Sequence, residues 1–91
     1  MTAAERVERI RQVLIAHLAP TELTIRDDSE AHAGHAGARE GGHFSVFVVS
    51  DRFAGRTRMQ RHRLVYDAVS ELLRTDIHAL RIQARTPQEN S

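Results

Sequence analysis

Hydrophobic residues near the start of the chain recur every three or four positions, as they do on one face of an amphipathic helix. The apolar positions are Val7, Ile10, Leu14 and Leu18. Thr2 and Glu5 have the spacing of a helix capping box. The pattern therefore predicts a helix that runs from just after Thr2 to about His17, and Pro20 prevents it from continuing.

Three later segments have the patterns of β-strands. Residues 23–26 alternate between apolar and polar side chains, like a half-buried strand. In residues 44–49, β-branched and aromatic side chains occur at both the odd and the even positions, so both faces of this strand are apolar. This predicts a central strand covered on more than one side. Residues 79–85 alternate strictly, and their polar positions are Arg81, Gln83 and Arg85. One face of the sheet is therefore expected to be solvent-exposed and basic at this last strand.

A second helix is predicted between the last two strands. Thr57 and Gln60 have the spacing of another capping box, and Arg63, Asp67 and Glu71 follow at helical spacing on the outside. The inward positions are Leu64, Val65, Ala68, Val69, Leu72 and Leu73. In the turn before this helix, we expect Phe53 to fill the core and Gly55 to adopt a positive φ angle.

The predicted order is helix, strand, strand, helix, strand, with a short last helix that could start at Thr86-Pro87. This order indicates an α+β fold with a three-stranded mixed sheet and helices on one face. The length suits one domain over residues 1–91. Within it, residues 28–42 form a long His/Gly loop between the first two strands, and residues 86–91 form a short tail.

The composition limits the chemistry. The chain has no cysteine, so it can supply no thiolate to a metal or cluster. Its basic residues are 13 arginines against 12 acids, and a net charge of +1 neither demands nor excludes nucleic acid. No apolar run approaches ~18 residues, which predicts a cytosolic protein without a membrane span. Neither Ser29 nor Ser50 lies in a nucleophile elbow, so we expect a binding protein and not an enzyme.

Histidines are the candidate metal ligands. His32 and His35 lie in the Gly/Ala-rich loop, where they could present two imidazoles to one metal or simply be solvated. His78 comes at the entry of the last strand, where it could project from the sheet end or be a core histidine bonded to a backbone carbonyl. His43 is given a supporting role, and His62 is expected to make a structural hydrogen bond.

Arginines are the candidate partner surface. In a helix-turn-helix arrangement, Arg58, Arg61 and Arg63 would meet phosphates or guanines, and Arg81 and Arg85 would extend the basic surface. The same arginines could instead dock an acidic partner. They could also form an ordinary solvated face, because acids lie on the same side of the helix.

Several short motifs occur in an order and spacing that chance seldom produces. They are Asp-Asp-Ser with a histidine three residues after the serine (Ser29, His32), His43-Phe44, Ser50-Asp51-Arg52-Phe53-Ala54-Gly55, Arg61-His62-Arg63, His78-Ala79-Leu80 and Thr86-Pro87. Together with the predicted layout, they resemble the BolA family over nearly the whole chain.

This resemblance implies a fold similar to the class II KH domain. It also implies a heterodimer with a monothiol glutaredoxin that shares a bridging [2Fe-2S] cluster with glutathione. In such a complex, the resemblance assigns ligand roles to His78 and to His32, with His35 as the alternative in the loop. The family also includes DNA-binding regulators of morphology and stress genes, which is the second function that the resemblance implies.

Overall fold

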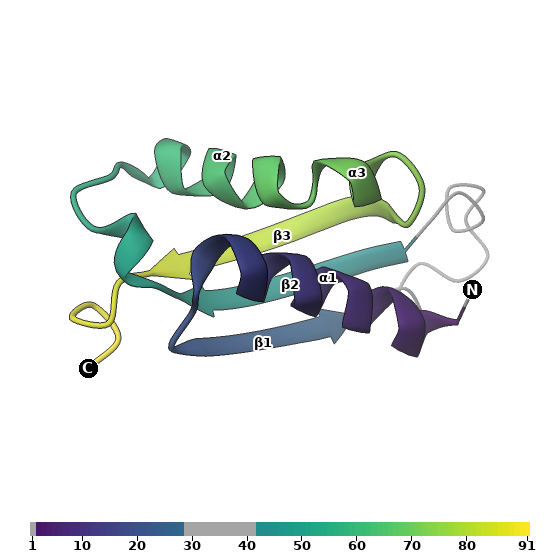
Figure 1. The fold of residues 1–91 in the computed structure, drawn as a ribbon, viewed down its shortest axis with the longest axis horizontal. Helices are drawn as coiled ribbons and strands as arrows, with labels where there is room; N and C mark the ends of the chain where they lie inside the picture. Colours follow the sequence, from purple (N-terminus) through teal and green to yellow (C-terminus); the bar gives the residue numbers. More distant parts are fainter. Residues whose placement is uncertain (1, 29–41) are drawn as a thin grey trace.

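The computed structural model describes residues 2–28 and 42–91, and its elements follow the predicted order. They are α1 (Ala3–Leu18), β1 (Glu22–Asp27), β2 (Gly42–Val49), the 3-10 turn η3 (Asp51–Phe53), α2 (Arg58–Ala68), α3 (Ser70–Leu73) and β3 (Ile77–Arg85). The strands form one sheet in the order β1-β2-β3, in which β1 is antiparallel and β3 parallel to β2. The helices lie on one face of this sheet (Figure 1), so the α+β prediction is confirmed.

The core lies between the helices and that face of the sheet. β2 contributes Phe44, Val46 and Val48, and the helices contribute the residues that fill the space above them. The helix residues in the core are Ile10, Leu14, Leu18, Val65, Val69 and Leu72. Leu23 and Ile25 of β1 are partly buried against the same cluster, because alternate strand residues point to the same face. The predicted inward positions of both helices and strands are therefore those that pack.

The other face of β2 is different from the prediction. A strand covered on more than one side was expected, but the described helices cover only the core face. Ser45 and Phe47 on the opposite face are half-buried, and the register places each between a residue of β1 and a residue of β3. Val49 on this face is almost fully buried, although it is outside the main core cluster. In the described part of the chain, the apolar residues on this second face of β2 therefore lie beside neighbouring strands and not under a second layer of helices.

Two helix predictions also differ in detail. The predicted second helix is divided at Val69, whose ψ of 13° leaves the helical range, into α2 and the single turn α3. Val65, Val69 and Leu72 stay buried across this division, so the apolar face is preserved. The expected last helix is a turn over residues 87–90, which the hydrogen bond from the Asn90 N–H to the Thr86 carbonyl closes.

The turn between β2 and α2 is built as the sequence predicts. Phe53 is fully buried, and Gly55 has a φ of 73°. Ser50 is also buried, and its hydroxyl donates a hydrogen bond to the Leu18 carbonyl over 2.6 Å while accepting one from the Arg52 N–H. This hydroxyl satisfies a carbonyl at the C-terminus of α1 and also caps η3. It joins two segments that are 32 residues apart.

Replacing Ser50 with alanine should lower the free energy of unfolding by about 1–3 kcal/mol, because the buried carbonyl of Leu18 loses its partner. Urea denaturation followed by far-UV circular dichroism measures the change. Ser70→Ala is the matched control, since Ser70 is exposed and makes no side-chain cap bond in α3. Equal stability of the two variants would show that the Ser50 bond contributes little.

Candidate functional site

The parallel pairing of β2 and β3 creates a site where both strands begin. Gly42 pairs with Ile77, but the next residue, His43, pairs with Ala79, so the register skips His78. The skip allows Ile77 and Leu80, an odd number of residues apart, both to pack on the core face. A bulge of this kind redirects a side chain and commonly does so next to functional sites.

The redirected side chain meets a second histidine. The ring centroids of His43 and His78 are 5.1 Å apart, and the ring planes are tilted by 51°. His78 is exposed and His43 is half-buried. The alternative that His78 is a buried core histidine is therefore wrong. His43, which the sequence placed in a supporting role, is its direct neighbour.

Backbone hydrogen bonds hold both sides of this site. The Asp28 N–H donates to the His43 carbonyl over 2.7 Å, and the Gly42 N–H donates to the Asp76 carbonyl over 3.0 Å. The Asp28 carboxylate accepts a hydrogen bond from Ser45 and pairs with Arg26, and these contacts lower the pKa of Asp28 below its ordinary value, the Ser45 bond most strongly. The other two candidate ligands, His32 and His35, lie outside the described residues.

Two neighbouring imidazoles are a suitable start for a metal site. With metal–nitrogen bonds of about 2.0–2.1 Å, two histidines on one tetrahedral ion have ring centroids roughly 5 Å apart, which matches the observed separation. Imidazole nitrogen is a borderline ligand that suits iron. In the part of the chain that the structure describes, no three histidine, aspartate or glutamate side chains come together as a metal site. This chain's described residues therefore offer two nitrogen ligands, and further ligands have to come from elsewhere.

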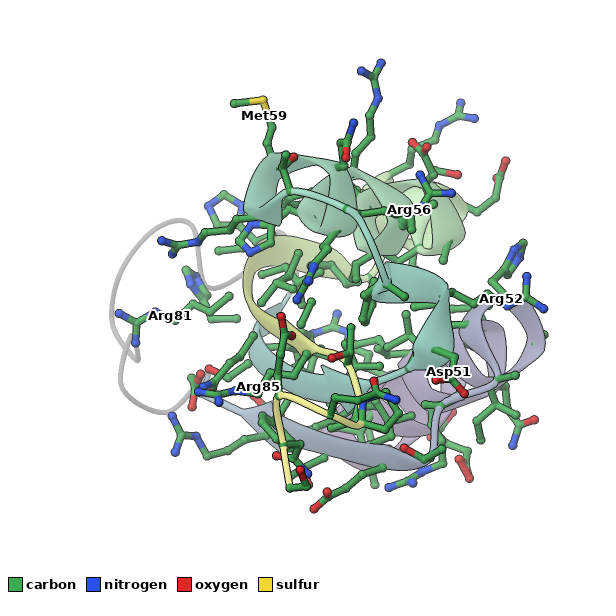
Figure 2. All side chains as sticks on the ribbon, turned by 90° about the vertical axis from the view of Figure 1, so that its left-hand side faces the viewer. Asp51, Arg52, Arg56, Met59, Arg81 and Arg85 are labelled. Atoms are coloured by element: carbon green, nitrogen blue, oxygen red, sulfur yellow. The ribbon has the colours of Figure 1, made fainter. Side chains whose placement is uncertain are left out.

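The candidate arginines divide into two groups. Arg58, Arg63 and Arg81 are exposed, Arg85 is partly exposed, and none of the four has an ion pair with another described residue. Figure 2 shows that Arg81 and Arg85 project from the same side of the molecule, away from Arg52. Within residues 2–28 and 42–91, these four guanidiniums therefore have no ion pair that would compete with a partner.

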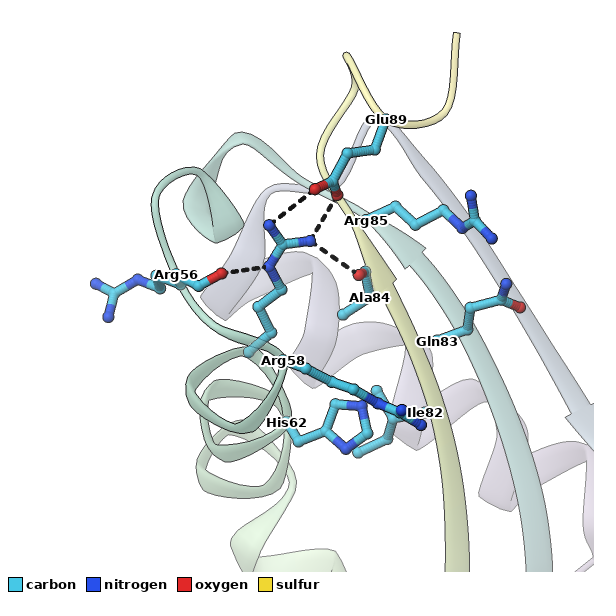
Figure 3. Close-up of a pocket in the computed structure, with 9 residues that line it drawn as sticks. Arg56, Arg58, His62, Ile82, Gln83, Ala84, Arg85 and Glu89 are labelled. Carbon is cyan, nitrogen blue, oxygen red and sulfur yellow. Dashed lines mark hydrogen bonds and ion pairs between the residues drawn. The ribbon is translucent and has the colours of Figure 1, made fainter.

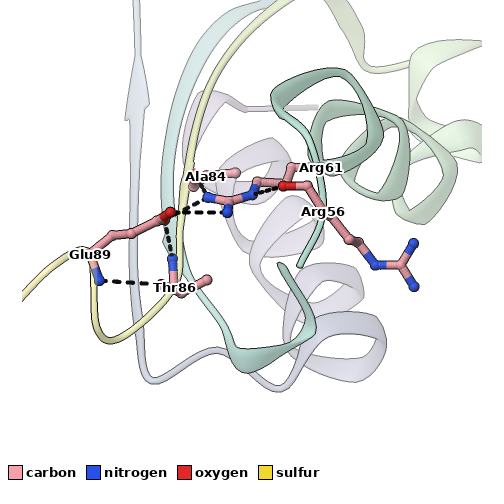
Figure 4. Close-up of polar contacts among 5 residues, drawn as sticks. All are labelled: Arg56, Arg61, Ala84, Thr86 and Glu89. Carbon is pink, nitrogen blue, oxygen red and sulfur yellow. Dashed lines mark hydrogen bonds and ion pairs between the residues drawn. The ribbon is translucent and has the colours of Figure 1, made fainter. Parts of the chain in front are cut away.

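Arg61 is the exception, because its guanidinium is used inside the molecule (Figure 4). It binds Glu89 through both carboxylate oxygens, at 2.5 and 3.0 Å, and donates to the carbonyls of Arg56 and Ala84. Four of its five N–H donors are therefore occupied. Its side chain is only 14% exposed, so it joins α2 to β3 and the C-terminal turn and offers little to a partner.

The Glu89 carboxylate is the other half of this contact. It also accepts a hydrogen bond from the Thr86 N–H, and the Thr86 hydroxyl accepts one from the Glu89 N–H. The hydrogen bonds from Arg61, and next those from Thr86, lower the pKa of Glu89 from 4.5 to about 2. This contact was not predicted from the sequence, although the spacing of Thr86 and Glu89 is that of a capping box.

A groove lies between α2 and the edge of β3 (Figure 3). Its volume is about 580 Å³, and Arg58 and His62 lie over Ile82 along its wall. The structural hydrogen bond expected for His62 is absent among the described residues; its ring lines the groove instead. Among the described residues, the element before α2 is the three-residue turn η3, and the helix after it, α3, is a single turn. Neither neighbour of α2 is therefore the second full helix of a helix-turn-helix.

No helix in the described ranges is long and apolar enough to cross a bilayer. The sequence matches the family model described as BolA-like protein over residues 14–89. The chain is 45% identical over 89 residues to Protein BOLA1, chloroplastic, of Arabidopsis thaliana, covering 93% of this chain and 56% of that protein. It is 40% identical over 82 residues to the DNA-binding transcriptional regulator BolA of Escherichia coli strain K12, covering 90% of this chain and 76% of that protein.

A solved structure, the BolA domain of SufE1 from Arabidopsis thaliana, is similar over 98% of both chains, with a TM-score of 0.83 and 44% identity. The chain spans only 24% to 61% of the length of the plant and mammalian relatives that head the comparison. Because the plant BOLA1 protein is named as chloroplastic, the cytosolic location expected from the sequence stays a prediction.

The contact between Arg61 and Glu89 predicts a specific acid response. Since the folded-state pKa of Glu89 is lowered, its stabilising effect should be present above pH 4.5 and be lost as the pH falls towards about 2. Glu89→Gln should therefore be less stable than the unmodified protein above this window, and the difference should shrink within it. Urea midpoints measured at a series of pH values test this.

The control is the same substitution in an Arg61→Gln background. There, the exchange of Glu89 should change the acid dependence much less, because the strongest cause of the lowered pKa is gone. Parallel pH profiles for the unmodified protein and Glu89→Gln would contradict the assignment.

Proposed function

We propose that this chain, which belongs to the BolA-like protein family, is an adaptor that pairs with a monothiol glutaredoxin and helps to bind a bridging [2Fe-2S] cluster. The role would be iron–sulfur cluster handling or iron and stress signalling. The observation that carries the proposal is the pair of imidazoles, His43 and His78, at the start of the parallel strands.

The ligand chemistry supports a shared cluster. This chain has no cysteine, so the thiolates would come from the glutaredoxin and from glutathione. Imidazole nitrogens would come from His78 and from one further histidine of this chain. When bound, a cluster with two histidines on one iron has a raised reduction potential and pH-sensitive ligation, which suits transfer.

The residues of the site have separable tasks. His78 is exposed at the end of an edge strand, where a partner protein can reach it. His43 is half-buried, and its backbone carbonyl accepts a hydrogen bond from the Asp28 N–H. It therefore supports the orientation of the His78 ring or acts as the second ligand itself. His32 and His35 remain candidates for that second position.

The proposal describes a binding protein and not an enzyme. In the same direction, the bacterial relative is named as a transcriptional regulator. The binding partner is proposed from ligand chemistry and from the family resemblance. The test must therefore detect both the partner and the histidines.

Mixing the chain with a monothiol glutaredoxin that carries a glutathione-ligated cluster should change the visible circular dichroism spectrum. His78→Ala should abolish the change, because it removes the exposed imidazole. The second ligand is identified by comparing His43→Ala, His32→Ala and His35→Ala, since only the ligating residue should reproduce the loss. An unchanged spectrum on mixing would overturn the proposal.

His17→Ala is the matched control for these variants. His17 is an exposed histidine in the last turn of α1, away from the starts of β2 and β3, so its loss should leave the spectrum of the complex unchanged. Size-exclusion chromatography of the same mixtures reports heterodimer formation separately. A heterodimer whose spectrum is indifferent to His78→Ala would count against the histidine site.

A second candidate function is regulation through duplex DNA. It is supported by the name of the bacterial relative and by Arg58 and Arg63, at the start and in the middle of α2, which are exposed and have no ion pair with a described residue. Arg61 is not included, because its donors are occupied by Glu89 and by backbone carbonyls.

If α2 binds duplex phosphates, Arg63→Gln and Arg58→Gln should each weaken binding and reduce the slope of log affinity against log salt by about 1. Fluorescence anisotropy with a duplex probe at several salt concentrations measures both effects. Arg52→Gln, an exposed arginine before α2, is the control. Binding that is independent of salt, or equal in all variants, would exclude this function for α2.

A further inference from the structure

The face of the sheet opposite the helices has a chemical character of its own. Alternate residues of all three strands point to it, and the register places Phe47 between Thr24 of β1 and Gln83 of β3. One row further along, Ser45 lies between Arg26 and Arg81. In the described part of the chain, no helix covers this open sheet face (Figure 1).

Two hollows meet beside β3. The first is the groove against α2, and the second, of about 510 Å³, lies on the open sheet face around Phe47. Arg58, Ile82 and Gln83 line both hollows, so Arg58 lies at the boundary between them. The hollows therefore form a connected surface that runs around the edge of β3.

The charge of this surface is strongly positive. The two hollows are lined by six arginines and by one carboxylate, Glu89, which is paired with Arg61. The charge of Arg26 is opposed by Asp28, whose carboxylate also interacts with Arg81 through space. The three arginines Arg58, Arg81 and Arg85 have no ion pair with a described residue. Several guanidiniums on one surface, without an ion pair to another described residue, favour a ligand that carries a repeating negative charge.

Phe47 adds a feature that an anion alone does not require. It is half-buried, lines the hollow on the open sheet face and is outside the hydrophobic core. A partly exposed aromatic ring beside arginines is a platform on which a nucleic-acid base can stack. Gln83 and Thr24, the exposed neighbours of Phe47, can donate and accept hydrogen bonds at base edges.

We infer that the open sheet face binds a short single-stranded nucleic acid, with a base stacked on Phe47 and phosphates on Arg58, Arg81 and Arg85. A duplex keeps its bases inside the stack and cannot place one on a ring within a flat sheet. A single strand exposes both its bases and its phosphates. The surface and the ligand therefore differ from those of duplex binding by α2.

The dimensions set the size and strength of the site. Arg81 and Arg85 are four residues apart on β3, which is ~13 Å, or about four nucleotide steps of 3.4 Å along a stacked strand. This is near the lower end of the site sizes of single-strand binders. With three arginines on phosphates, log affinity should fall with log salt with a slope of about −2.

The test uses the chain without metal or protein partner. A fluorescent oligothymidylate of about twelve nucleotides, long enough for the site, should bind in an anisotropy titration more tightly than a duplex of the same length. Phe47→Leu keeps an apolar side chain but removes the ring, and it should weaken binding about tenfold. Arg81→Gln should weaken it several-fold and reduce the salt slope by about 0.7.

Two substitutions serve as controls. Arg63→Gln changes an exposed arginine of α2 that lines neither hollow, and His78→Ala changes the histidine site. Both should leave single-strand binding unchanged, so the result does not depend on the proposed cluster. Thermal unfolding of each variant checks that it is folded, and the exposed Arg81 provides the test if Phe47→Leu is unstable.

Several results would overturn the inference. One is an absence of binding at low salt, and another is binding that both Phe47→Leu and Arg81→Gln leave unchanged. A third is a preference for the duplex that depends on the same residues. The last is equally tight binding of poly-glutamate, which would show that the face is an acidic-protein surface without a role for stacking.

Discussion

The parallel pairing of β2 with β3 is the contact on which the rest of the structure depends. Parallel neighbours require a crossover, and η3, α2 and α3 supply it over one face of the sheet. The same pairing makes β2 the central strand and leaves β3 at an edge. The one-residue skip at His78 then lets Ile77 and Leu80 both reach the core while the skipped imidazole meets His43.

Side chains of α2 form hydrogen bonds with backbone carbonyls on the exposed edge of β3. The Tyr66 hydroxyl donates to the Leu80 carbonyl, and Arg61 donates to the Ala84 carbonyl, so two edge acceptors are satisfied without another strand. Such capping protects an edge strand from pairing with other chains. Arg61 also holds Glu89, so the end of the chain is attached to the same edge. This structural use explains why one arginine of the basic set differs from its neighbours.

The histidine site and the proposed single-strand site share β3. His78 is at the start of the strand and Arg85 at its end, a separation of seven residues or ~23 Å. Arg81, which belongs to the single-strand site, is three residues or ~10 Å from His78. A nucleic acid on Arg81 therefore comes close to a partner protein on His78.

The sequence by itself determined the order of elements, the inward faces, both helix starts, the buried Phe53 and the positive φ of Gly55, because periodicity, capping and turn chemistry act within a few residues. It also predicted the basic alternation of β3. Only the tertiary structure decided that His43 adjoins His78, that Arg61 is used by Glu89 and that Phe47 lies on an open face. Each of these depends on strand register or on contacts between residues far apart in the chain, which no local pattern specifies.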